Sequence, residues 1–179
     1  MNKGDKFMIF VKYVFLSFIF VSASLIGIMF SKKYKNRVEE LKSFKEACNV
    51  LESKIKFTYE PLGDIFEEIA DIYQNNQISN IFKNTNINMK NKDFRLAWNE
   101  SIEKSKQQLN LKKEDINIIK SLGNMLGKTD VQGQLSEISL NMNFLDTQIR
   151  LAEEEQHKNE KMYKTLGTIV GLAIIIILI

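Results

Sequence analysis

Two apolar runs, one near each end of the sequence, enclose a body whose hydrophobic positions recur at helical spacing. The first run extends from Tyr13 to Phe30 and the second from Leu166 to Ile179, and neither contains a charged residue. An uncharged helix of about 18 residues covers most of the roughly 30 Å hydrocarbon core of a bilayer, because a helix rises about 1.5 Å per residue. We therefore predict transmembrane helices over residues 13–30 and 166–179, preceded by a short tail over residues 1–12.

The first run has a second interpretation as a cleaved signal peptide. Lys3, Lys6 and Lys12 form a basic segment before it, and Ser22–Ser24 offers small residues for cleavage. Apolar residues continue from Leu25 to Phe30 beyond that position, which favours an uncleaved anchor. The second run covers about 21 Å as a helix, so it spans a bilayer fully only if neighbouring residues extend it or the bilayer thins locally.

The body between the two runs, residues 31–165, predicts an all-α domain. Its apolar residues recur three and four positions apart without period-2 alternation, and the chain contains one proline, Pro61. We predict helices to about residue 59, over 61–73, 93–108 and 112–126, and a last helix that starts after an N-cap at Asp130 and continues unbroken into the second run. Between residues 74 and 91 we expect a short helix and then a loop at 84–88. The prediction is a bundle of about six helices with long first and last arms.

The expected core positions form one apolar stripe on each helix. Before the last helix they are Tyr34, Val38, Leu41, Phe44, Cys48, Leu51, Ile55, Leu62, Ile65, Phe66, Ile69, Tyr73, Phe94, Ala97, Trp98, Ile102, Ile116, Ile119, Leu122, Met125 and Leu126. The last helix carries a heptad seam of Val131, Leu135, Ile138, Met142, Leu145, Ile149 and Ala152. We expect three further residues to widen this seam: Leu140, Phe144 and Leu151.

Charge distribution predicts the topology of the chain in a membrane. Basic residues follow the first run and precede the second, and they are Lys32, Lys33, Lys35, Arg37, Lys158, Lys161 and Lys164. By the positive-inside rule the body is cytoplasmic and both ends face the other side.

The single cysteine, Cys48, agrees with a reducing compartment. Charges within the body nearly cancel, so the formal net charge of +3 comes mainly from the N-terminal lysines and predicts no nucleic-acid partner.

The sequence lacks the residue groupings of common active sites. His157 is the only histidine, and no His/Cys cluster has metal-ligand spacing. The segment from Gly123 to Thr129 ends in Gly-Lys-Thr, but three residues rather than four separate its glycines and it follows a helix instead of a strand. We interpret it as a helix terminus and turn. The prediction is a protein that is not an enzyme and that holds no cofactor and no metal.

Small residues one turn apart occur within both apolar runs. Ala23 and Gly27 form such a pair in the first run, and Gly167 and Gly171 form a GxxxG pair in the second. Small residues at this spacing let helix backbones approach closely in lipid, where packing drives association. These four residues are candidates for transmembrane packing, either between the two spans of one chain or between two chains.

Four carboxylates form the polar face of the second helix of the body. They are Asp64, Glu67, Glu68 and Asp71, which alternate with the apolar stripe of the same helix. These four residues are candidates for a face that docks a basic partner, and the alternative is an ordinary solvated helix face.

An ordered set of landmarks resembles a known family. The landmarks are the two terminal apolar runs, the segment Tyr59–Leu62, Ala97-Trp98, the turn Leu122–Gly127, Asp130, Gln134 and the closing segment Lys164–Gly167. Together they resemble the stage III sporulation protein AB family of endospore-forming bacteria. That resemblance implies a membrane component of the apparatus that joins mother cell and forespore during engulfment.

The same resemblance implies the partners of the chain. The body of the family is similar to the cytoplasmic domain of the inner-membrane platform proteins of type II secretion and type IV pilus systems. It would lie on the mother-cell side of the outer forespore membrane, near a secretion-type ATPase and other membrane components. Because platform proteins have two such domains and this chain has one, self-association as a homo-oligomer is a further hypothesis.

Two other functions remain as alternatives. A membrane-anchored signalling adaptor or sensor would require a sizeable extracytoplasmic portion, which the two short ends do not supply. A membrane enzyme that uses buried carboxylates would require acidic residues within the apolar runs, and neither run contains one. The function that the resemblance implies is therefore favoured: a non-catalytic platform that organises or couples a secretion-type ATPase.

Overall fold

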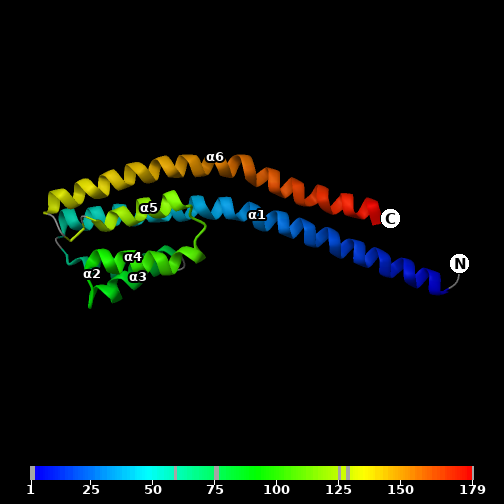
Figure 1. Ribbon diagram of the computed structural model, residues 1–179, viewed down its shortest axis with the longest axis horizontal. Helices are drawn as coiled ribbons and strands as arrows, with labels where there is room; N and C mark the ends of the chain where they lie inside the picture. Colours follow the sequence, from blue (N-terminus) through cyan, green and yellow to red (C-terminus); the bar gives the residue numbers. More distant parts are fainter. Residues whose placement is uncertain (1–2, 59, 75–76, 125, 128–129, 179) are drawn as a thin grey trace. The chain divides into compact units, whose positions relative to one another are not determined.

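The computed structural model describes residues 3–58, 60–74, 77–124, 126–127 and 130–178, and the regular elements in these ranges are all helical. The α-helices, labelled in Figure 1, are α1 (Lys3–Phe57), α2 (Leu62–Ile72), α3 (Gln77–Met89), α4 (Phe94–Ser105), α5 (Lys113–Ser121) and α6 (Val131–Leu178). Two short 3₁₀ helices, η1 (Lys106–Gln108) and η2 (Leu122–Asn124), follow α4 and α5. The predicted all-α class, with long first and last helices, is confirmed.

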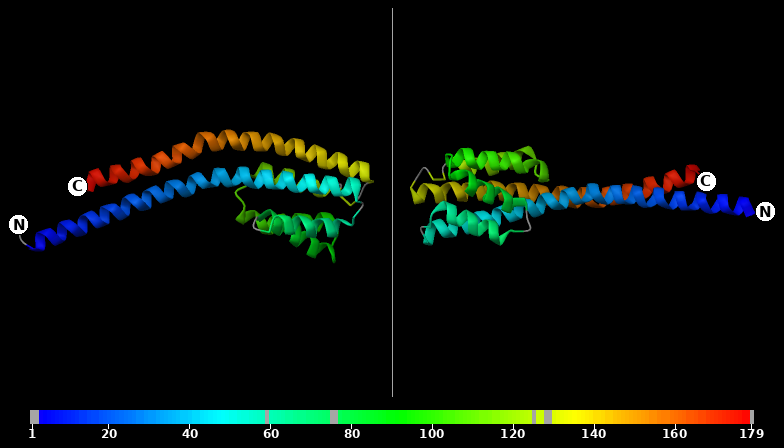
Figure 2. Two further views of the ribbon diagram at one scale, coloured as in Figure 1. Left: turned by 180° about the vertical axis from the view of Figure 1, so that it is seen from behind. Right: turned by 90° about the horizontal axis from the view of Figure 1, so that it is seen from below.

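The chain divides into two compact units. The first comprises Met1–Lys35 and Glu154–Ile179, and the second comprises Asn36–Glu153. In the second unit, α1 and α5 lie between α6 on one side and the group of α2, α3 and α4 on the other (Figures 1 and 2). The expected single helix from residue 130 into the second apolar run is observed as α6.

The core of the second unit is built from the stripes that periodicity predicts. Fully or largely buried residues include Val38, Leu41, Phe44, Cys48, Leu51 and Ile55 of α1, and Ile138, Leu145, Ile149 and Ala152 of α6. Around the buried Trp98, the rings of Phe44, Phe66, Phe82 and Phe94 lie with centroids 5.5–6.2 Å away. The indole Nε1–H of Trp98 donates to the carbonyl oxygen of Ile119 at 2.9 Å, so burial of this side chain leaves no unpaired donor.

The predicted widening of the α6 seam is wrong. Leu140, Phe144 and Leu151 are 48%, 51% and 39% exposed, whereas Ile138 and Leu145 are fully buried. At about 100° per residue, the three exposed positions lie on the opposite face of α6 from the buried seam. They form a second apolar stripe of the helix and do not extend the first.

The expected loop at residues 84–88 is also wrong, because α3 continues through it to Met89. Asparagine is a weak helix former, but Ile78, Ile81 and Phe82 of this helix are fully buried. Thr85 is buried as well, and its Oγ1–H donates to the carbonyl oxygen of Ile81 at 2.7 Å. Packing of this apolar face therefore outweighs the low helix propensity of the segment.

Two predicted helix boundaries depend on single residues. The carbonyl oxygen of Pro61 accepts the first backbone hydrogen bonds of α2, which begins one residue later than predicted. Asp130 caps α6 as predicted, because its Oδ1 accepts the backbone N–H of Gly133 at 2.9 Å. The described residues do not include Tyr59, Met125 and Ile179, at which the sequence predicts helix, or Lys128 and Thr129 of the turn before α6.

Replacing Gly123 by alanine is expected to lower the free energy of unfolding by about 1–3 kcal/mol through overpacking. A Cβ on Gly123 would lie 2.5 Å from Cδ1 of Trp98, which is itself enclosed by other rings. Denaturant unfolding of the full-length protein, followed by Trp98 fluorescence, measures this loss. Gly63→Ala is the matched control, because its Cβ would meet only the movable Oδ1 of Asn86 at 3.1 Å. Equal stability of the two variants would show that the pocket around Trp98 adapts to the added methyl group.

Candidate functional site

In the first unit, the backbones of α1 and α6 approach each other closely at two glycines. A Cβ on Gly27 would lie 2.6 Å from the carbonyl oxygen of Tyr163 and 3.0 Å from Cα of Gly167. A Cβ on Gly167 would lie 2.9 Å from the carbonyl oxygen of Ala23. Contacts this short to backbone atoms leave no room for a side chain, so glycine is required at both positions.

The other two small residues named from the sequence belong to the same contact. A Cβ on Gly171 would lie 3.4 Å from Cβ of Ala23 and 3.0 Å from Cδ2 of Phe20. The structure therefore brings Ala23, Gly27, Gly167 and Gly171 together between α1 and α6 of one chain. We predict that this contact operates within a bilayer.

An aromatic cluster follows this glycine contact along the two helices. The ring of Tyr163 stacks on those of Phe30 and Tyr34, with centroids 5.8 and 5.7 Å apart. A side-chain hydrogen bond between the two tyrosines is the main cause that raises the pKa of Tyr34, and burial and nearby negative charge add to it. Sequence reasoning did not find this cluster, although tyrosine at the end of an apolar run is a known signal for a membrane interface.

The outer surfaces of the two helices in the first unit are strongly apolar. Both α1 and α6 contain an 18-residue window that is long and apolar enough to cross a membrane, and most of each window is exposed. Large exposed side chains include Phe10, Phe15, Phe18, Met29, Ile169 and Ile176. Because a helix that is apolar on all sides requires an apolar environment, these two segments suggest membrane association.

The structure keeps the predicted acidic face of α2 together. Asp64, Glu67 and Asp71 are exposed, and α2 contains no basic residue. Glu68 is partly buried, and its Oε2 forms an ion pair with Nζ of Lys54 in α1 at 2.6 Å. Three of the four predicted carboxylates are therefore presented to solvent, and the fourth also stabilises the contact between α2 and α1.

A buried ion pair, which sequence reasoning missed, connects the helices of the second unit. Nε and Nη2 of Arg37 in α1 donate to the two carboxylate oxygens of Asp115 in α5, at 2.8 and 3.0 Å. Nη2 also donates to Oε1 of Gln148 in α6 at 3.3 Å, and the backbone N–H of Lys112 donates to Asp115 at 2.8 Å. Residues so far apart in sequence carry no local pattern that would have revealed this network.

Glu40 of α1 makes a second polar connection, to the segment that leads into α5. Its carboxylate accepts hydrogen bonds from the backbone N–H and the side-chain Nδ2 of Asn110, both at 2.7 Å. Burial raises the pKa of Glu40, and the two hydrogen bonds oppose that shift in part. Both polar connections orient the segment around the start of α5.

Reactive groups in the described part of the chain are dispersed. No group of three or more His, Cys, Asp or Glu residues there is placed to hold a metal ion. His157 is exposed, and Cys48 is fully buried. Burial raises the pKa of the Cys48 thiol, which keeps it protonated and weakly nucleophilic. The features that the structure assembles are contact surfaces: the glycine contact of the first unit and the acidic face of the second.

Comparisons with known proteins cover almost the whole chain. The family model described as Stage III sporulation protein AB matches residues 12–179. A curated relative from Bacillus subtilis (strain 168), named Stage III sporulation protein AB, is 30% identical over 163 residues, which cover 90% of this chain and 95% of the relative. A solved structure of the same name is 25% identical, with a TM-score of 0.64, and the match covers 69% of this chain and 98% of that chain. All three comparisons lead to proteins of one description.

Proposed function

The chain belongs to the stage III sporulation protein AB family, and from this we propose that it is a non-catalytic platform in a membrane apparatus required for sporulation. The family is described by its role in sporulation and not by a reaction. We further propose that the apparatus is a secretion-like channel between mother cell and forespore. In it, the all-α body organises or couples a secretion-type ATPase and other membrane components.

The observation that carries the proposal is that α1 and α6 each contribute residues to both units of the chain. Each helix includes an apolar window suited to a membrane and a buried stripe of the folded body. The glycine contact between Gly27 and Gly167 supports a paired anchor. A platform requires this combination, because a partner that docks on the body then acts on a domain fixed to the membrane by two helices.

The topology proposed for the chain places the second unit in the cytoplasm of the mother cell. Single-cysteine variants test this in a Cys48→Ala background: Ser139→Cys on an exposed position of α6 and Asn2→Cys in the N-terminal tail. In growing cells that produce the protein in the cell membrane, a membrane-impermeant maleimide should label Asn2→Cys and should label Ser139→Cys only after permeabilisation. The reverse pattern would place the body on the outside and rule out docking to a cytoplasmic ATPase.

ATPase coupling is tested by binding and by localisation. Immobilised full-length protein in detergent should retain the secretion-type ATPase of the same organism, and an unrelated membrane protein with two helices should not. In sporulating cells that lack the protein, a fluorescent ATPase should lose its membrane position, and few heat-resistant spores should form. Normal ATPase localisation in these cells, together with absence of binding, would reject the coupling while leaving the sporulation role of the family in place.

A further inference from the structure

A basic groove lies along α5 and the end of α4. It has a volume of about 540 Å³, and four lysines line it: Lys106, Lys112, Lys113 and Lys120. Glu103 is the one acidic residue in its lining, and it bonds to the ammonium groups of Lys106 and Lys120, which lower its pKa to about 2. The ammonium groups exceed the carboxylates in this lining, so the groove favours an anionic partner.

The acidic face of α2 matches this groove in charge and in spacing. Asp64 and Asp71 are seven residues apart on α2, and Lys113 and Lys120 are seven residues apart on α5. Both intervals span about 10.5 Å along a helix axis. When the two helices are aligned antiparallel, each aspartate lies opposite a lysine. Glu67 then lies opposite Asn117, which lines the groove. An asparagine side chain can offer N–H donors to a carboxylate.

We infer that the acidic face of α2 docks antiparallel into the lysine groove of a second copy of this chain. In this arrangement Asp64 lies opposite Lys120 of the second copy, and Asp71 lies opposite its Lys113. Antiparallel alignment also places the positive N-terminal end of each helix beside the negative C-terminal end of the other. The inference depends on the predicted docking role of the α2 face and names its basic partner.

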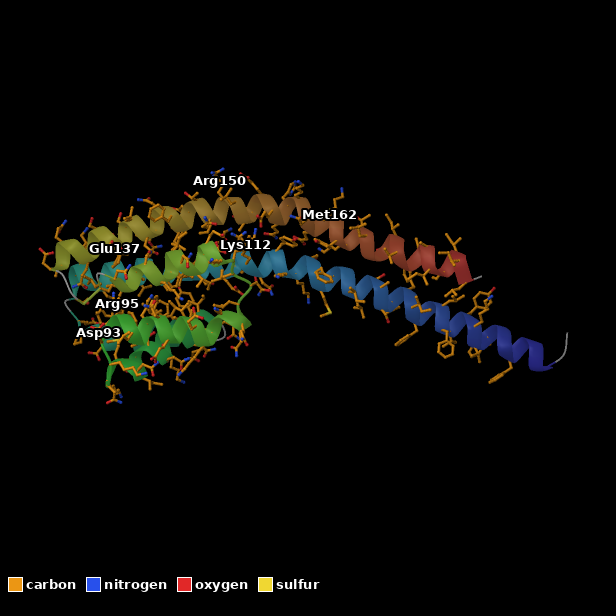
Figure 3. All side chains as sticks on the ribbon, viewed as in Figure 1. Asp93, Arg95, Lys112, Glu137, Arg150 and Met162 are labelled. Atoms are coloured by element: carbon orange, nitrogen blue, oxygen red, sulfur yellow. The ribbon has the colours of Figure 1, made fainter. Side chains whose placement is uncertain are left out.

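The two surfaces belong to different layers of one copy. α2 lies with α3 and α4 on one side of α1, and α5 lies beside α1 in the central layer (Figures 1 and 2). Lys112, which directly precedes α5, lines the groove. In Figure 3 it lies at the opposite end of the second unit from Asp93 and Arg95, which are at the start of α4. A contact between the face of one copy and the groove of the next leaves one surface of each kind free. Such a head-to-tail contact closes into a ring or continues as an open array.

The α3 side of the acidic face also carries positive charge. Lys83 and Lys90 line a pocket of about 540 Å³ together with Glu67 and Asp71. These lysines reduce the negative potential of the face, and exposed ion pairs are individually weak and screened by salt. The contact is therefore expected to form at low salt, to strengthen where copies are concentrated in a membrane, and to dissociate as ionic strength rises.

A charge-swap experiment on the full-length protein in detergent tests the inference. The first variant, Asp64→Lys/Glu67→Lys/Asp71→Lys, reverses the face, and the second, Lys113→Glu/Lys120→Glu, reverses the groove. In sedimentation velocity at low salt the native protein should self-associate, and each variant alone should lose at least tenfold in association constant. An equimolar mixture of the two variants should recover association within about threefold of native, because every face then meets a groove of opposite charge.

A matched control places the same charge change elsewhere. Lys158→Glu/Lys161→Glu alters two exposed lysines outside the groove and should leave association unchanged. Circular dichroism confirms that each variant is folded, and Asp64→Asn/Glu67→Gln/Asp71→Asn replaces the first variant if reversal unfolds it. The inference is overturned if the native protein stays monomeric at low salt, if a folded variant associates like the native protein, or if the mixture stays monomeric. Because no ATPase is present, none of these results bears on ATPase coupling.

Discussion

Replacing Asp115 by alanine is expected to lower the free energy of unfolding by about 3–5 kcal/mol, because it leaves a buried guanidinium without its counter-charge. The side chains of Arg37 and Asp115 are 5% and 0% exposed, so water does not compensate the lost contact. The backbone N–H of Lys112 loses an acceptor in the same variant. Denaturant unfolding of the full-length protein in detergent, followed by Trp98 fluorescence, measures the loss.

Two further variants separate the cost of leaving a buried charge unpaired from the net contribution of the ion pair to stability. Arg37→Met/Asp115→Leu removes both charges and should be destabilised much less than Asp115→Ala, because apolar replacements of similar volume often match a buried pair. Glu100→Ala removes an exposed partner of Lys92 and should change stability by less than about 1 kcal/mol. A loss for Asp115→Ala no larger than that for Glu100→Ala would show that water reaches Arg37.

Local sequence patterns predicted the fold correctly where a single residue sets a helix boundary or where hydrophobic residues recur at helical spacing. Pro61 and Asp130 mark the starts of α2 and α6 because of their own backbone and side-chain chemistry, and the stripe from Val38 to Ile55 is buried as its spacing indicates. The loop expected at residues 84–88 was wrong because propensity was weighed without the tertiary contacts that bury Phe82 and Thr85. Weak local propensity gives way whenever a helix face can be buried.

The errors on α6 and in the core network have a different physical origin. Periodicity shows that Leu140 and Phe144 share a face, but it does not show which face meets a neighbouring helix. The pair of Arg37 and Asp115 joins residues 78 positions apart, and Trp98 meets Gly123 in the same non-local way. Contacts of this kind depend on how helices are arranged, which no local window of sequence encodes.

The candidate sites were likewise predictable only where their residues lie on one helix. Spacing identified the four small residues and the four carboxylates as groups, because members of one helix face recur every three or four positions. It left open whether the small residues join two spans of one chain or two chains, and the structure places Gly27 against Gly167 of the same chain. The lysine groove combines residues of η1 and α5 with the segment between them, so it emerged only from the fold.

Placing isoleucine at both Gly27 and Gly167 is expected to separate the helices of the first unit. The new Cβ atoms would lie 2.6 and 2.9 Å from the carbonyl oxygens of Tyr163 and Ala23, and backbone atoms cannot move aside as a flexible side chain can. Overpacking costs about 1–3 kcal/mol at each site. Because 1.4 kcal/mol corresponds to a factor of ten, the equilibrium between paired and separated helices should shift by at least about tenfold.

Disulfide crosslinking in membranes measures this shift. Phe20→Cys with Gly171→Cys, in a Cys48→Ala background, places two thiols across the contact, because a Cβ on Gly171 would lie 3.5 Å from Cα of Phe20. Adding Gly27→Ile/Gly167→Ile should strongly reduce the oxidised fraction. Adding Ser17→Ile, at an exposed position of α1, should not. Unfolding of the second unit, followed by Trp98, should stay unchanged in both. Undiminished crosslinking would show that the glycine contact does not hold the two helices together in a bilayer, and the paired anchor of the proposed platform would then require another source of stability.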